Sequence, residues 1–78
     1  LIRALLETNP TGQTLWTIGN GYQQKNELDK AIRYHRLAVT KLKEEGNHYG
    51  LVLNNLGITY SKKNDWDKAI EYSLQAAE

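Results

Sequence analysis

The chain repeats its own residue pattern with a period of 38 positions. When the segment 15–38 is shifted by that distance, eleven of its 24 residues meet an identical residue in the segment 53–76. Average amino-acid usage would give roughly one or two identities by chance. The identical pairs are Leu15/Leu53, Gly19/Gly57, Tyr22/Tyr60, Lys25/Lys63, Asn26/Asn64, Asp29/Asp67, Lys30/Lys68, Ala31/Ala69, Ile32/Ile70, Tyr34/Tyr72 and Ala38/Ala76. Because periods of about 20 to 50 residues are typical of stacked supersecondary units, the duplication predicts a solenoid built from helix pairs.

The first half of each copy has the apolar spacing of an amphipathic helix. Small or apolar residues recur at helical spacing between about positions 12 and 25, and the second copy repeats them. These residues are Leu15, Ile18, Gly19 and Tyr22, then Leu53, Leu56, Gly57 and Tyr60. Each helix is expected to end at a Lys-Asn pair, Lys25-Asn26 or Lys63-Asn64, because asparagine tolerates the left-handed backbone of a helix C-cap.

The second half of each copy predicts a helix that packs back on the first. It begins near Asp29 or Asp67, where an acidic residue favours the helix dipole. The residues expected to point inward, or nearly so, are Ala31, Ile32, Tyr34, His35 and Ala38 in the first copy, and Ala69, Ile70, Tyr72, Ser73 and Ala76 in the second. Trp66 aligns with Leu28 and is expected in the core.

A glycine occupies the same place in both first helices, at Gly19 and Gly57. Glycine inside a helix costs roughly 1 kcal/mol relative to alanine, so it needs a compensating contact. We expect the second helix to press its small Ala31 or Ala69 against the first helix at this point. The two helices of each pair would then be unusually close.

Composition excludes several classes of protein. The net charge of +1 provides no field for nucleic acid or a membrane surface. No apolar run approaches the roughly 20 residues that a membrane span needs. The chain has no cysteine, so neither a disulfide framework nor thiolate chemistry is expected. We therefore expect no nucleic-acid or membrane partner, and we take a cytoplasmic location as the expectation.

The organisation predicted from these patterns is one fragment of a repeat array that covers residues 1–78. Residues 1–9 are expected to be the tail of a preceding helix, since Asn9-Pro10 forbids helix continuation. Residues 12–47 form the first helix pair, whose second helix reaches about Glu45 before the breaker Gly46-Asn47. Residues 48–78 form the second pair.

The first helices resemble the tetratricopeptide repeat. The resemblance rests on Leu15-Trp16-Thr17-Ile18-Gly19-Asn20-Gly21-Tyr22 and Leu53-Asn54-Asn55-Leu56-Gly57-Ile58-Thr59-Tyr60, each followed nine residues later by Ala31 or Ala69. It implies an all-α fold of antiparallel helix pairs stacked in a right-handed superhelix. The period exceeds the family's usual length of about 34 residues. The extra residues lie between Val39 and Gly50, and the exit 45–50 resembles the glycine-bounded turn of long-repeat members found in signalling scaffolds and bacterial sensor or peptide-receptor proteins.

The resemblance also implies that one face of each first helix lines a groove for a protein or peptide partner. The predicted groove residues are Gln13, Trp16, Thr17, Asn20, Gln23 and Gln24 from the first copy, and Leu51, Asn54, Asn55, Ile58, Ser61 and Lys62 from the second. Amides suit an extended peptide because each both donates and accepts hydrogen bonds. Trp16 is the main candidate for a binding hot spot. The alternative is that Trp16 covers the stub of the preceding helix or the neighbouring core.

Asn20 and Asn55 also match two asparagines of the carboxylate clamp by which some members of the family grip chaperone tails. Trp16 stands where that clamp has a lysine. Catalysis is not expected, because His35 and His48 are 13 positions apart without metal-ligand spacing. His35 is instead expected to have a hydrogen-bonded packing role. The sequence has no nucleophile motif and no phosphate loop, so we expect no enzyme activity, metal or cofactor.

These observations predict a non-catalytic scaffold that holds a protein or peptide segment in the groove. A structural alternative is self-association, in which the exposed ends of a short array pair two chains into a homo-oligomer. It follows from the need of repeats for about three neighbours to bury a continuous core. The long-repeat resemblance also fits a peptide-sensing regulatory domain of a larger signalling protein.

Overall fold

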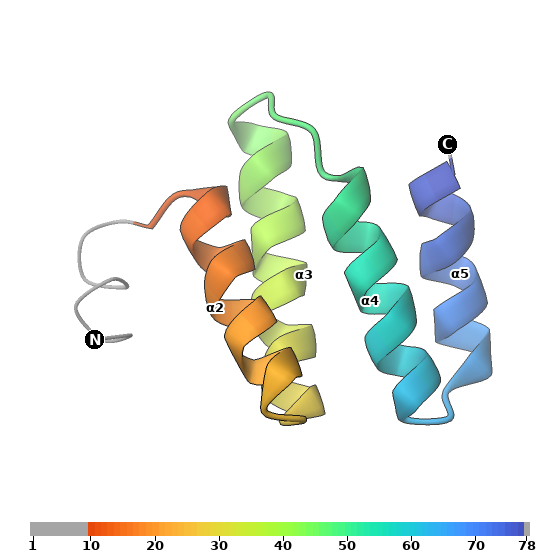
Figure 1. Cartoon of the computed structure of the whole chain (residues 1–78). Helices are drawn as coiled ribbons and strands as arrows, with labels where there is room; N and C mark the ends of the chain where they lie inside the picture. Colours follow the sequence, from red (N-terminus) through yellow and green to blue (C-terminus); the bar gives the residue numbers. More distant parts are fainter. Residues whose placement is uncertain (1–9, 78) are drawn as a thin grey trace.

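The computed structural model describes residues 10–77, which form two antiparallel helix pairs side by side (Figure 1). The first pair consists of α2 (Gly12–Gln24) and α3 (Leu28–Glu44), and the second of α4 (Gly50–Lys62) and α5 (Trp66–Ala77). Residues 10–77 contain no strand, so the all-α prediction is confirmed. The predicted helix tail falls on residues 1–9, which lie outside the described part.

The turn inside each pair has the predicted asparagine in the left-handed conformation. The φ angles of Asn26 and Asn64 are 62° and 64°. After α2, the N–H of Glu27 donates to the carbonyl of Tyr22 at 2.9 Å, and the turn after α4 repeats this bond from Asp65 to Tyr60 at 2.9 Å. Such bonds satisfy carbonyls that a helix end leaves free. The sequence prediction for both turns is therefore confirmed.

The amino-terminal end of α2 is held by two acceptors from different parts of the chain. The hydroxyl of Thr11 accepts the N–H of Thr14 at 3.2 Å. The carboxylate of Glu45, just after α3, accepts the N–H of Gly12 with both oxygens, at 3.2 and 3.1 Å. A carboxylate at a helix amino terminus is favoured by the free N–H groups and the helix dipole. Glu45 thus ties the two ends of the first pair together.

Two apolar clusters form the core. The first joins Leu15, Ala38, Leu42 and Val52, with Trp16, Tyr34, Val39 and Tyr49 packed against it. The second joins Ile32, Leu53 and Leu56, with Val39, Tyr49, Tyr60, Tyr72 and Ala76 packed against it. Both clusters contain residues of α3 and α4. The core therefore extends across the junction between the two pairs.

Each pair also has a stacked pair of tyrosines. The rings of Tyr22 and Tyr34 have centroids 5.5 Å apart, and those of Tyr60 and Tyr72 are also 5.5 Å apart. Because these residues are aligned by the 38-residue period, the same contact forms twice. The duplication in sequence is thus a duplication of side-chain packing.

Gly19 and Gly57 lie at close contacts, as expected, but their nearest neighbours are not the predicted alanines. A methyl group added at Gly57 would lie 2.7 Å from the hydroxyl oxygen of Ser73 and 3.3 Å from the backbone oxygen of the predicted Ala69. A methyl group added at Gly19 would overlap the ring of His35, because this fully buried ring lies one turn further along α3 than the predicted Ala31. Because Gly19 has no side chain, the imidazole ring of His35 fits against its backbone.

Candidate functional site

The twelve predicted groove residues all lie on the first helix of each pair. Six belong to α2 and six to α4. The exposed members are Gln13, Thr17, Gln24, Leu51, Asn54, Ile58 and Lys62, whereas Trp16, Asn20, Gln23, Asn55 and Ser61 are half-buried. None of the twelve is fully covered by the second helices.

Four of these residues come together around one polar hollow. Asn20, Gln23 and Gln24 from α2 and Lys62 from α4 line an open hollow of about 280 Å³. Its lining consists of three amides and one ammonium group. It therefore offers both donors and acceptors of hydrogen bonds, with one positive charge.

The oxygen of the Asn20 amide joins the two helix pairs. Asn20 Oδ1 accepts a hydrogen bond from His35 Nε2 at 2.9 Å and a second from Asn55 Nδ2 at 3.2 Å. Since the oxygen accepts, Nε2 of His35 carries the proton. Asn20 Nδ2 has no acceptor among residues 10–77 and is left for another group.

His35 is fully buried and serves a structural role, as predicted. Burial lowers the pKa of its imidazole to about 4, because a charged ring would lose its hydration. The ring is therefore neutral near pH 7. Its Nδ1 atom is buried and finds no hydrogen-bond partner among the described residues. His35 cannot serve as a solvent-facing acid or base.

Trp16 contributes to the core as well as to the predicted groove. Its ring is half-buried and packs against the cluster that contains Leu15 and Val52. The indole N–H is buried without a hydrogen-bond partner in the part of the chain that the structure describes. This packing supports the alternative interpretation, in which Trp16 covers the neighbouring core.

The predicted burial of Trp66 and Ile70 is wrong. Both side chains are 58% exposed, and with Ile58 and Leu74 they line an apolar hollow of about 580 Å³ on the second pair. The aligned Ile32 is buried because Leu53 and Leu56 pack on it. Within residues 10–77, no further helix covers Ile70 in the same way. Periodicity predicts which residues form this face, but burial also depends on a neighbour.

Residues 10–77 offer no group of three or more acidic, histidine or cysteine side chains that could hold a metal ion. His48, the second histidine, is exposed in the loop before α4. In this part of the chain no helix is long and apolar enough to cross a membrane.

Comparison with known proteins agrees with the arrangement of the helices. A sequence model of the tetratricopeptide repeat family matches residues 10–78. The searches of curated proteins and of solved structures give no significant match. Repeats of this family generally act as protein–protein interaction scaffolds and are typically non-catalytic. With two aligned helix pairs, repeated caps and repeated glycine contacts, the chain belongs to the tetratricopeptide repeat family.

Proposed function

We propose that the chain is a non-catalytic scaffold module that binds an extended peptide segment of a partner protein across α2 and α4. The observation that carries this proposal is the polar hollow formed by Asn20, Gln23, Gln24 and Lys62. These side chains come from aligned helices of consecutive repeats. A ligand in the hollow would contact both repeats at once.

The chemistry of the hollow suits the backbone of an extended peptide. The free Nδ2 group of Asn20 donates to a peptide carbonyl, since its oxygen is engaged by His35 and Asn55. Gln23 and Gln24 each donate and accept, so they match the alternating groups of a peptide backbone. Lys62 adds a preference for an acidic side chain near this point. A carboxylate clamp is not part of this proposal, because the Asn55 amide already donates to Asn20 and is not free to hold a carboxylate.

Selection of peptides from a displayed random library, followed by calorimetry, tests the groove. The variant Gln23→Ala/Gln24→Ala/Lys62→Ala should weaken binding of the selected peptides about tenfold or more, because it removes several hydrogen bonds to the peptide. The matched control Lys25→Ala/Lys30→Ala/Lys68→Ala changes three exposed residues outside the hollow and should leave the affinity unchanged. Equal affinities of the groove variant and the native chain would contradict the proposal.

A second candidate function is self-association through the open face of the second pair. The exposed Trp66, Ile70 and Leu74 favour it, because a large apolar face on a soluble domain is typical of an interaction site. A second copy covering this face would remove these side chains from water.

Sedimentation at several concentrations tests self-association. The native chain should show a mass that rises with concentration, and Trp66→Ser/Ile70→Gln should remain a monomer. A native chain that stays monomeric across the concentration range would exclude this function. It would leave the groove proposal untouched, because the two surfaces share only Lys62 among their lining residues.

A further inference from the structure

The exposed face of α3 differs in chemistry from the aligned face of α5. Arg33, Arg36 and Leu37 align with Glu71, Leu74 and Gln75 of α5. Most inward residues between and beside them are identical in both copies, as with Ile32/Ile70, Tyr34/Tyr72 and Ala38/Ala76, whereas His35 aligns with Ser73. The repeat fold is therefore built with either set of outward residues. The two arginines are not required by the repeat as such.

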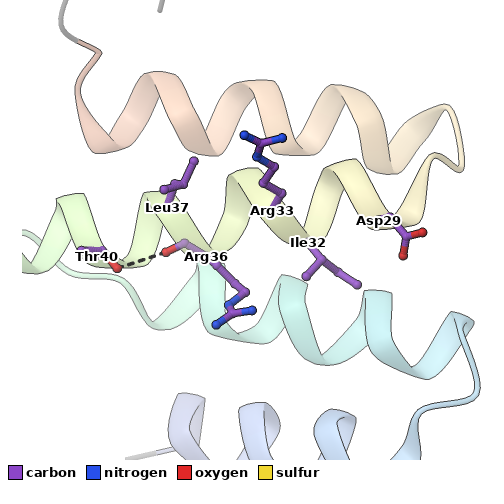
Figure 2. Close-up of a pocket in the computed structure, with 6 residues that line it drawn as sticks. All are labelled: Asp29, Ile32, Arg33, Arg36, Leu37 and Thr40. Atoms are coloured by element: carbon purple, nitrogen blue, oxygen red, sulfur yellow. Dashed lines mark hydrogen bonds between the residues drawn. The ribbon is translucent and has the colours of Figure 1, made fainter.

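These outward residues surround an open hollow of about 550 Å³. Its lining residues are Asp29, Ile32, Arg33, Arg36, Leu37 and Thr40. Figure 2 shows the Arg33 and Leu37 side chains on the side of α3 toward α2, and the Arg36 and Ile32 side chains on the side toward α4. Each guanidinium group thus has one apolar residue on its own side of α3.

Within residues 10–77, the two arginines of this hollow have no acidic partner. Neither Arg33 nor Arg36 lies within salt-bridge distance of a carboxylate in the described part of the chain. The only acidic residue of the lining is Asp29, and its carboxylate is paired with Lys63 of the second helix pair. Among the described residues, two exposed positive charges therefore remain without a partner. Groups with carboxylates would complement them.

Leu37 adds an apolar contact to the charged pair. Its side chain is 46% exposed, although it lies on a helix whose inward face is well packed. Ile32, on the other side of α3, is almost fully buried and offers little free surface. A ligand of matching chemistry has acidic groups close to an apolar one.

We propose that this face of α3 is a second docking surface, which takes an acidic peptide segment of a partner protein. Arg33 and Arg36 bind carboxylates on the two sides of the segment, and an apolar side chain of the segment packs on Leu37. Guanidinium groups suit this task because they bind carboxylates with two parallel hydrogen bonds. The surface is separate from the hollow on α2 and α4, and its use does not depend on the groove.

Fluorescence anisotropy with a dye-labelled peptide of sequence Glu-Glu-Leu-Glu-Glu-Leu-Glu-Glu tests the proposal on the whole chain. The native chain should bind it saturably in low salt. Arg33→Gln/Arg36→Gln should weaken binding about tenfold, the loss expected for two partly exposed charge-assisted contacts. Arg33→Lys/Arg36→Lys should give an intermediate affinity, because lysine keeps the charge but not the paired hydrogen bonds.

Three controls distinguish binding at this surface from an effect of net charge, from binding in the groove and from a general affinity for polyanions. Lys25→Gln/Lys68→Gln removes the same number of positive charges elsewhere and should bind as the native chain does. An equal loss of affinity in this control would show that net charge alone causes the effect, and it would overturn the proposal. Loss on Lys62→Gln with retention on Arg33→Gln/Arg36→Gln would assign the peptide to the groove instead. No saturable binding by the native chain, or equal binding of single-stranded DNA through the same arginines, would also overturn it.

Discussion

The two helix pairs carry the same core pattern but bury it to different extents. Ile32 is 8% exposed, whereas its counterpart Ile70 is 58% exposed. Ala38 is fully buried and Ala76 only half-buried. The difference arises because α4 covers the outer face of the first pair, and no described helix covers that of the second. In this family of folds the burial of one unit is completed by the next.

Other features do not differ between the pairs. The left-handed asparagine, the stacked tyrosines and the close contact at the glycine form in both. All three depend on residues within one pair. A helix pair therefore specifies its own turn and internal packing, and its neighbour determines how much of its outer face is removed from water.

The largest expected effect comes from changing the glycine contact in the first pair. Gly19→Val places carbon atoms in the space of the buried His35 ring and should destabilise the chain by more than about 3 kcal/mol, at the upper end for overpacking. Gly57→Val should cost less, because the smaller and exposed Ser73 can move. Urea unfolding followed by far-UV circular dichroism measures both. Equal losses of stability in the two variants would contradict the difference between the His35 and Ser73 contacts.

The second prediction compares the two aligned isoleucines directly. Ile32→Ala removes a buried side chain from the junction and should cost about 3 kcal/mol. Ile70→Ala removes an exposed one and should cost less than about 1 kcal/mol. Both are measured by urea unfolding at a low chain concentration, which keeps any association out of the comparison. A large loss for Ile70→Ala would mean that its face is covered in solution.

The third prediction concerns the buried histidine, which the second pair replaces by Ser73. The unfolded chain takes up a proton with an ordinary pKa near 6.5, and the folded chain only near a pKa of about 4. Between these values the unfolded state binds more protons, so stability falls as the pH is lowered. From pH 7 to pH 4.5 this single group should cost about 2 kcal/mol of stability.

Thermal unfolding across that pH range tests the histidine. His35→Gln should be less stable at pH 7 but should lose less stability on acidification than the native chain. The matched control is His48→Gln, which changes an exposed histidine and should keep the native pH dependence. If His35→Gln and the native chain have parallel pH profiles, the buried ring is not the group responsible.

The sequence predicted the fold well, because its strongest signals are local. The period of 38 residues, the Lys-Asn helix ends and the inward faces of the first pair all follow from spacing and backbone preference. Trp66 and Ile70 were predicted wrongly, since their apolar character says where they lie on α5 and not whether another helix covers them. The contact between His35 and Gly19 was also missed, because spacing does not fix which side chain of α3 meets the glycine.

Much less of the candidate site could be predicted. Periodicity placed Asn20 and Asn55 on the same face of the array, but it could not indicate that their amides bond to each other and to His35. These bonds depend on the distance between α2 and α4, which is set by the way both helices pack against α3. The sequence likewise could not show that the α3 arginines have no carboxylate partner among residues 10–77, because ion pairing is decided by tertiary neighbours.

The smallest expected effect tests the bond that joins the two pairs at the groove. Asn55→Ala removes the donor to Asn20 Oδ1, a partly buried bond between aligned first helices, and should cost about 1 kcal/mol. Its counterpart by the 38-residue period, Thr17, bonds only to the backbone of its own helix, so Thr17→Ala should change stability by less than about 0.5 kcal/mol. Asn55→Ala should also free the Asn20 amide to rotate, which nitrogen-15 relaxation of its side-chain NH2 group would detect. An Asn20 amide that stays as ordered in Asn55→Ala as in the native chain would mean that His35 alone holds it, and that the groove does not depend on the junction between the repeats.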